Sequence, residues 1–157
     1  MNRARTAGIV YMLVFVTGIT ALLVRGPVGS AAGALAGLLY AGVTVLFYLL
    51  FKPVNQRVSL IAAAVSLLGI TAGPILKVNP LPAFGIYCLL ISYLILASSN
   101  VPRFLGVLMA LAGLGWLTFL SPSLARQLSP YNFGPGIIGE GSLTLWLVIA
   151  GTEPRRS

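Results

Sequence analysis

Six apolar runs, separated by short polar links, follow one another along the chain. They cover residues 7–24, 28–51, 58–76, 83–99, 104–120 and 136–151. A helix needs roughly 17–25 mainly apolar residues to cross a hydrocarbon core about 30 Å thick, and most of the runs have that length. The pattern therefore predicts an all-α fold: one integral membrane domain over residues 1–157, built as a bundle of six transmembrane helices.

The links carry the residues that end and begin helices. Arg25, Gly26 and Pro27 form a short turn between the first two runs. Pro53 discourages continuation of the second helix, and Asn55 is suited to cap the third. Pro102 fits the first turn of the fifth helix. Residues 121–134 are expected to form the longest connection.

Basic residues divide unequally between the two sets of links. If the amino terminus is cytoplasmic, the inner side holds seven of them: Arg3, Arg5, Lys52, Arg57, Arg103, Arg155 and Arg156. The outer side then holds three: Arg25, Lys77 and Arg126. Short cytoplasmic loops carry an excess of Lys and Arg, so the sequence predicts that both termini are cytoplasmic. The expected location is the plasma membrane of a bacterium, with multiple passes.

Composition agrees with a membrane protein. The chain is 58% hydrophobic and 8% charged, whereas a soluble domain is about 45–50% apolar and about 25% charged. The net charge of +8 is spread between the apolar runs. Nucleic-acid binding would call for a clustered basic patch, so we expect the lipid bilayer, and no nucleic acid, as partner.

The residue inventory limits the possible chemistry. The chain has no His, a single Cys and only two acidic residues, Glu140 and Glu153. This excludes an internal disulfide, His-ligated metals, His-dependent triads and paired aspartates. We expect no metal, no cofactor and no catalysis, although chemistry by Lys, Tyr or a single Glu remains open.

Glu140 is the only acidic side chain within an apolar run. A carboxylate at membrane depth is costly and usually faces protein or water, which makes it a candidate functional residue. Gly136, Glu140, Thr144, Leu147 and Gly151 are three or four residues apart and share one stripe of a helix. The small residues of this stripe indicate that it faces the bundle. The candidate ligand-binding residues are Glu140, Thr144 and Arg126.

Other conspicuous residues have structural explanations beside functional ones. Arg103 and Asn55 are candidates for contact with lipid headgroups, but a cytoplasmic charge anchor and a helix cap explain them more simply. Tyr87 is expected near a membrane interface, and Trp116 is expected to serve packing. The second run places small residues at steps of four, namely Gly29, Gly33 and Gly37. Such a face packs within the bundle or forms a homo-oligomer interface.

Three blocks of residues resemble a known family. The first is Lys52-Pro53-Val54-Asn55 with Leu60, the second runs from Pro102 to Gly106, and the third holds Gly139-Glu140, Leu145-Trp146-Leu147 and Gly151. In this order they resemble the bacterial membrane family catalogued as domain of unknown function 4386, over residues 38–151. The resemblance implies a fold and no established activity.

Three classes of function are open. Glu140 could bind a proton, a cation or a basic group in a binding or transport bundle. It could instead pair within the bundle of an accessory or structural subunit. A membrane-embedded enzyme acting on lipid is disfavoured by the absence of His and Asp. A structure that shows the surroundings of Glu140 separates these alternatives.

Overall fold

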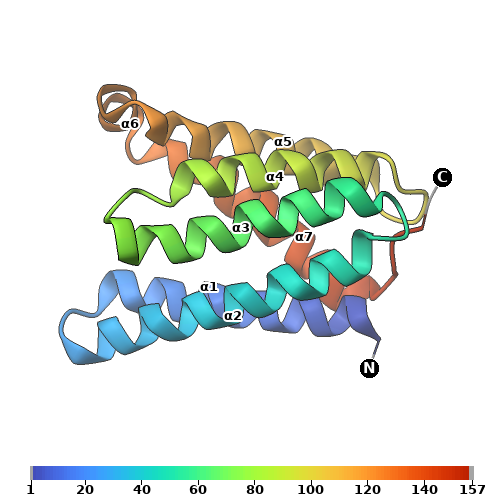
Figure 1. Cartoon of the computed structure of the whole chain (residues 1–157), viewed down its shortest axis with the longest axis horizontal. Coiled ribbons are helices and arrows are strands. Elements are labelled where there is room, and N and C mark those ends of the chain that lie inside the picture. The colour runs from blue at the N-terminus through green and yellow to red at the C-terminus, as the bar shows by residue number, and fades with distance from the viewer. Residues whose placement is uncertain (1, 156–157) are drawn as a thin grey trace.

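The computed structural model describes residues 2–155 and is all-helical over that range (Figure 1). The elements are α1 (Arg3–Leu23), α2 (Pro27–Phe51), α3 (Gln56–Leu76), α4 (Leu81–Leu96), α5 (Arg103–Leu117), η1 (Thr118–Leu120), α6 (Pro122–Leu128), η2 (Tyr131–Phe133) and α7 (Gly134–Ala150). The prediction of an all-α fold is confirmed. The six long helices lie over the six apolar runs, with ends shifted by a few residues.

The polar links begin and end these helices as local chemistry requires. The side chain of Asn55 accepts a hydrogen bond from the Val58 amide at 3.2 Å, so it caps α3. Asn2 caps α1 in the same way, accepting from the Arg5 amide at 3.0 Å. Gly26 has φ 86° between α1 and α2, a conformation that favours glycine. These caps satisfy amide groups that a helix leaves unpaired.

The connection predicted over residues 121–134 is partly helical in the structure. It contains a helix, α6, and a 3-10 turn, η2. The Ser121 hydroxyl accepts from the Leu124 amide at 3.4 Å, and Pro122 occupies the first turn of α6. Both features favour a helix start. Ser and Pro are common both in turns and at the first positions of helices. The sequence of this segment therefore did not distinguish a short helix from a loop.

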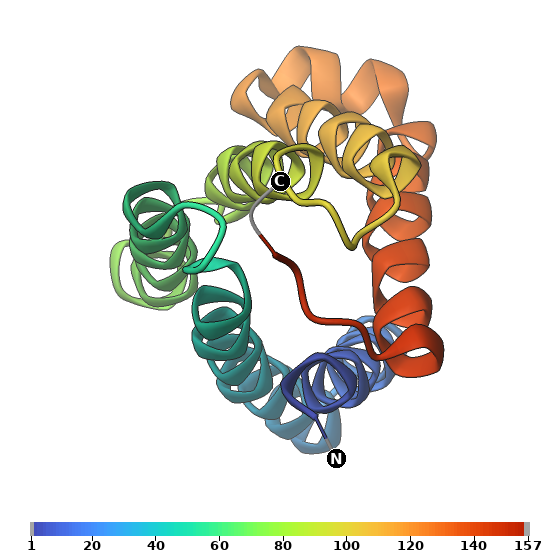
Figure 2. The same cartoon turned by 90° about the vertical axis from the view of Figure 1, so that its right-hand side faces the viewer.

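The long helices form a closed ring (Figure 2). Each packs on its neighbour in the chain from α1 to α5, and α7 closes the ring by packing on both α5 and α1. The chain runs up and down, so both described ends of the chain lie at the same end of the bundle, as Figure 1 shows. The segment after α7 crosses that end of the ring (Figure 2). It is held there by bonds from the Ser99 amide to the Arg155 carbonyl and from Asn100 to the Glu153 carbonyl.

Aromatic side chains fill the interior between α1, α2 and α4. The Tyr11 ring packs edge-on against Phe47 and Tyr40, at centroid distances of 5.6 and 5.8 Å. Tyr40 in turn lies 6.2 Å from the ring of Tyr87. Tyr87 is 1% exposed, so it is a core side chain and not the exposed interfacial anchor that was expected. The bundle buries this tyrosine because its position on α4 faces the ring interior.

The outer surface of the ring is apolar. Most large exposed hydrophobic side chains lie on the six long helices, with Leu22 at 82% and Leu38 at 73% exposure. Among the described residues, five helical segments are long and apolar enough to cross a membrane by length and composition; α4, with 16 residues, is apolar but shorter. Length, composition and this apolar exterior together suggest a membrane protein.

On the predicted glycine face, only Gly29 has a close contact: a Cβ added there would lie 1.8 Å from the carbonyl oxygen of Val24, the C-cap residue of α1. A Cβ added at Gly33 would meet only Ala21, at 3.6 Å, and one at Gly37 only Ile70, at 3.9 Å. In contrast, a Cβ at Gly139 of α7 would lie 2.5 Å from the Leu108 carbonyl oxygen of α5. Between α4 and α5, a Cβ added at Gly85 would lie 2.9 Å from the Gly113 carbonyl oxygen, and one added at Gly113 would lie 2.8 Å from the Gly85 carbonyl oxygen. Small residues therefore also allow close helix contacts along α4, α5 and α7, which the predicted face did not include.

Candidate functional site

Glu140 lies on the inward face of α7. It is 8% exposed, and the other members of its stripe, Gly136, Thr144, Leu147 and Gly151, are buried as well. The spacing of these residues thus identified the inward face of the helix. Gly151 ends α7 with φ 59°, and the Asn2 side chain donates to its carbonyl oxygen. This contact ties the end of α7 to the start of α1.

Three donors from three other helices surround the carboxylate. The Tyr11 hydroxyl of α1 donates to Oε2. The Trp116 indole Nε1 of α5 donates to Oε1 at 2.6 Å, and the Cys88 thiol of α4 lies 3.8 Å from the same oxygen. We call these four residues, Glu140, Tyr11, Cys88 and Trp116, the Glu140 cluster. It joins four of the six long helices at one buried point.

A glycine makes room for the indole. A Cβ added at Gly136 would lie 2.2 Å from Cζ2 and 2.5 Å from Cε2 of Trp116. Phe133 also packs edge-on against the ring, at a centroid distance of 5.7 Å. Gly136 and Phe133 therefore position the indole so that its N–H points at the carboxylate one turn further along α7. Trp116 packs against the core as expected, and its N–H in addition donates to a buried acceptor, which the sequence did not predict.

Two more tyrosines lie beside the cluster with unsatisfied hydroxyls. Tyr40 and Tyr87 are both buried, and both lie near enough to Glu140 for its charge to act on them. Their hydroxyl oxygens are fully covered and make no hydrogen bond of good geometry with the described residues, although that of Tyr40 is close to Tyr11. A buried hydroxyl without a partner is costly, so this region has unused hydrogen-bonding capacity.

Basic side chains are absent from the surroundings of Glu140 in the described part of the chain. Its hydrogen bonds come from a hydroxyl, an indole N–H and a thiol. Arg126, predicted as a partner, lies exposed on α6 at the end of the bundle, and no ion pair joins it to Glu140. Glu140 and Arg126 do not meet because α6 lies at the end of the bundle, where the Arg126 side chain is exposed.

The remaining predicted site residues lie elsewhere or act locally. The Thr144 hydroxyl donates to the main-chain carbonyl of Glu140 at 2.7 Å, so it bonds within its own helix. Arg103 is exposed at the first position of α5. Asn55 caps α3, as described above. Of the predicted residues, only Glu140 and the backbone-bonded Thr144 belong to the buried site.

The described residues hold no group of three His, Cys, Asp or Glu side chains that could bind a metal ion. The cluster instead combines one carboxyl group with neutral donors and with hydroxyls that can donate or accept. Such a set of groups can hold a proton on the carboxyl group or stabilise a charged carboxylate by hydrogen bonds. It could also bind a small cation that prefers oxygen ligands, between the carboxylate and the hydroxyl oxygens of Tyr40 and Tyr87.

Comparison with known proteins places the second half of the chain in context. A family model described as Domain of unknown function (DUF4386) matches residues 75–151. The match contains the second and third blocks of the resemblance noted in the sequence, while the first block precedes it. It also contains Cys88, Trp116 and Glu140 of the Glu140 cluster, whereas Tyr11 lies outside it.

One relative extends over more of the chain. An uncharacterised protein of Archaeoglobus fulgidus is 27% identical over 129 residues, which cover 71% of this chain and 76% of the relative. No solved structure matches the chain. The comparisons confirm the resemblance to the family, and they bring no activity with them.

Proposed function

We propose that this chain, whose residues 75–151 belong to the family described as Domain of unknown function (DUF4386), is a six-span plasma-membrane protein that binds a proton at Glu140. It would thereby serve proton-dependent binding or transport. The observation that carries the proposal is a buried carboxyl group that four helices enclose and that pairs with no basic side chain of the described residues.

The six-span topology rests on the path of the chain. Because α3 and α5 both begin at the end of the bundle that holds the described chain ends, α4 has to cross the bundle to connect them (Figure 1). Its 16 residues correspond to about 24 Å at 1.5 Å per residue, near the hydrocarbon thickness of about 30 Å.

The distribution of charge supports cytoplasmic termini. Six described basic residues lie at the end of the bundle that holds the described chain ends: Arg3, Arg5, Lys52, Arg57, Arg103 and Arg155. Arg156, which also counted toward the prediction, lies outside the described residues. Arg25, Lys77 and Arg126 lie at the opposite end. An excess of Lys and Arg is typical of the cytoplasmic side, and this distribution supports cytoplasmic termini.

The chemistry of the cluster favours a proton over a metal ion. Burying a carboxylate in an apolar medium without a countercharge is costly, and taking up a proton removes that charge. Both carboxylate oxygens already accept hydrogen bonds, whereas an alkali or alkaline-earth ion needs several free oxygen ligands. Intramembrane carboxyl groups are typical of proton relays in pumps and transporters.

Trp116 provides a direct readout of this proton. Its indole donates to the carboxylate, so a change in the charge of Glu140 changes the environment of the fluorophore. The chain has two tryptophans, and Trp146→Phe leaves Trp116 as the single one. We expect the Trp116 emission of this variant to follow a one-proton titration. Glu140→Gln should abolish the titration, and Glu153→Gln, at the only other acid in the chain, should preserve it.

Two outcomes contradict the proposal. Emission that does not change with pH while the protein stays folded excludes a titrating Glu140. Emission that responds at fixed pH to sodium or potassium, and not to protons, assigns the site to a metal cation.

A second candidate, a structural subunit in which Glu140 serves as a latch, has an observation of its own. Both carboxylate oxygens are satisfied by donors from α1 and α5. For a latch, we expect Glu140→Gln to lower thermal stability because an amide N–H₂ would face the donors, while the parent protein shows no titration of Trp116 emission. The same variants therefore distinguish the two candidates.

A further inference from the structure

The surroundings of Glu140 differ between the two ends of the bundle. We call the end that holds α6 the α6 end, and the end that holds the described chain ends the terminal end. Glu140 and Tyr40 are 8% and 9% exposed. The inward residues one turn closer to the terminal end, Leu143, Thr144 and Val43, are all 0% exposed. Exposure of the interior therefore stops at the level of Glu140.

Helix α1 packs closely on α7 at the terminal end and separates from it beyond Tyr11. A Cβ added at Gly8, three residues before Tyr11, would lie 2.8 Å from the Val148 amide nitrogen of α7. Gly18 lies seven residues beyond Tyr11, on the same face of α1, and a Cβ added there meets nothing within 4 Å. The two helices therefore diverge beyond the hydrogen bond between Tyr11 and Glu140.

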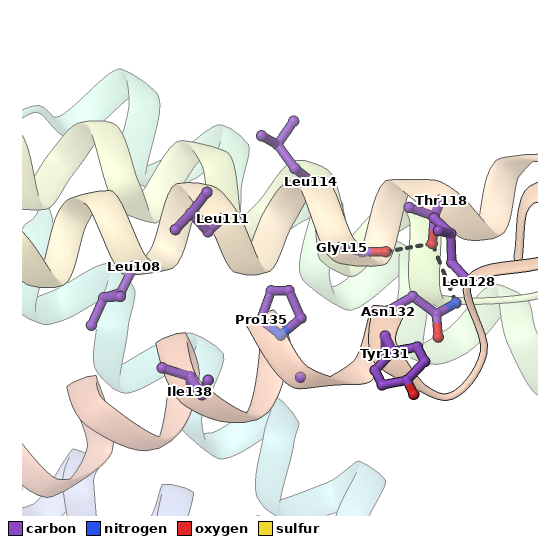
Figure 3. A pocket seen from close by; sticks show the side chains of 11 residues that line it. Leu108, Leu111, Leu114, Gly115, Thr118, Leu128, Tyr131, Asn132, Pro135 and Ile138 are labelled. Atoms are coloured by element: carbon purple, nitrogen blue, oxygen red, sulfur yellow. Dashed lines mark hydrogen bonds between the residues drawn. The ribbon is translucent and has the colours of Figure 1, made fainter.

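At the α6 end, α7 packs on α5 instead. A Cβ added at Gly115 of α5 would lie 3.3 Å from Cβ of Pro135, which faces α5 in Figure 3. Gly136 and Gly139 make the close contacts with α5 already described. Figure 1 shows the same arrangement, because α7 runs obliquely across the bundle from the start of α1 toward α6. The first half of α7 thus packs on α5 and its second half on α1.

The hairpin of α1 and α2 is loosely packed toward the α6 end. In these two fully described helices, residues 12–23 include no buried side chain, and residues 27–39 include only Gly29. The inward stripe of α2 changes in size at Tyr40. Its half-buried members toward the α6 end are small, namely Gly33, Ala36 and Gly37, whereas its buried members toward the terminal end are larger, namely Val43, Phe47 and Leu50. Large side chains therefore fill the interior on one side of Tyr40 only.

The interior at the terminal end is closed by apolar side chains. Six large ones, contributed by α2, α4, α5 and α7, are 0–3% exposed: Phe47, Leu50, Leu94, Ile95, Leu105 and Leu147. The buried Ser92 hydroxyl in this region is already bonded to the Gly106 carbonyl at 2.7 Å. From Glu140 to Ala150 the packed layer extends over ten residues of α7, about 15 Å at 1.5 Å per residue. The segment after α7 then crosses the end of the ring (Figure 2). A proton has no polar route through such a layer.

We propose that Glu140 exchanges its proton with the α6 end of the bundle and not with the terminal end, so that this structure is the outward-accessible state of the site. The inference rests on the proton binding proposed above and adds the side from which the proton comes. On the proposed topology, the α6 end faces the outside of the cell. Release to the cytoplasm then requires a second conformation, in which the packed layer opens.

The other titratable groups around Glu140 do not replace it as the charged group of the site. They come from α1, α2 and α4, and each of them is neutral when protonated: Tyr11, Tyr40, Tyr87 and Cys88. In water, tyrosine and cysteine lose their protons at about pH 10 and about pH 8.5. A response between about pH 4 and pH 8 therefore reports the carboxyl group.

The test reads Trp116 emission while the pH is changed on one side of a membrane. Two exposed glutamines mark the two ends, so Gln127→Cys on α6 and Gln56→Cys at the start of α3 are made separately in the Trp146→Phe chain. Cys88 is 0% exposed and is kept. Each variant is reconstituted sparsely, so that a vesicle holds a single protein, and is labelled from outside with an impermeant biotin maleimide. Capture on streptavidin then selects vesicles with the labelled end outward.

We expect a step in external pH to change the emission at once in vesicles captured through Gln127→Cys. In vesicles captured through Gln56→Cys, the immediate change should be lost, and it should return only when a protonophore equilibrates the lumen. Adding Glu140→Gln to either variant should remove the response in both orientations, which assigns the signal to this carboxyl group.

Two results overturn the proposed side: an immediate response in the Gln56→Cys vesicles, or none in the Gln127→Cys vesicles. Either result leaves the proton site itself in place, because the titration in detergent tests that site without reference to sides. If the protein in detergent shows no titration at all, the proton site is refuted and this inference with it.

Discussion

Gly136→Ala tests the geometry of the Glu140 cluster most directly. The new methyl group would lie 2.2 Å from Cζ2 of Trp116, whereas ordinary van der Waals contact begins near 3.4 Å. The indole therefore has to move by about 1.2 Å. In the parent protein the indole Nε1 lies 2.6 Å from Glu140 Oε1. A displacement of this size breaks or severely weakens that hydrogen bond. Phe133 packs against the ring and limits its escape.

The expected cost combines two effects. Overpacking a close-packed interior costs about 1–3 kcal/mol, and a lost hydrogen bond costs about 0.5–1.5 kcal/mol. Together they lower the free energy of unfolding by about 1.5–4.5 kcal/mol. In the Trp146→Phe background, the variant should unfold at a lower temperature in detergent, and the emission maximum of Trp116 should move because its acceptor is lost.

Gly141→Ala is the control for helix propensity and for the substitution itself. It is five residues further along α7, and a Cβ there meets nothing within 4 Å. Alanine favours a helix by up to about 1 kcal/mol over glycine, so this variant should be as stable as the parent or more so. If Gly136→Ala matches Gly141→Ala in both unfolding midpoint and emission, the close contact between Gly136 and the indole is refuted.

Two further predictions address the cluster and the topology. Tyr11→Phe removes a donor to the carboxylate and should lower the free energy of unfolding by about 1–3 kcal/mol. Tyr87→Phe removes a buried hydroxyl that has no hydrogen-bond partner among the described residues, and it should be neutral or stabilising in the same thermal assay. The reverse order would contradict the assigned bonds. Single cysteines at Gln56 and Gln127, in a background lacking the native cysteine, should differ in labelling by an impermeant reagent applied to intact cells. Only Gln127 should react, and labelling of Gln56 alone would invert the topology.

The sequence alone predicted the helices and the inward face of α7. Apolar runs of adequate length, interrupted by Asn55 and by turn residues such as Gly26, specify where helices begin and end because these signals act over a few residues. The spacing of Gly136, Glu140 and Thr144 likewise identified one side of a helix. The short α6 was missed because its seven residues lack an apolar run and begin with the signals of a turn.

Tertiary structure decided what Glu140 contacts. Its donors come from positions separated from it by 129, 52 and 24 residues, namely Tyr11, Cys88 and Trp116. Periodicity tells which face of a helix is buried, but not which helix lies opposite or how far that helix is rotated and shifted. Here those quantities follow from ring closure by α7 against both α1 and α5, and from close approaches such as that of Gly139 to the Leu108 carbonyl. They depend on the packing of the whole bundle, so no local pattern of residues could specify them.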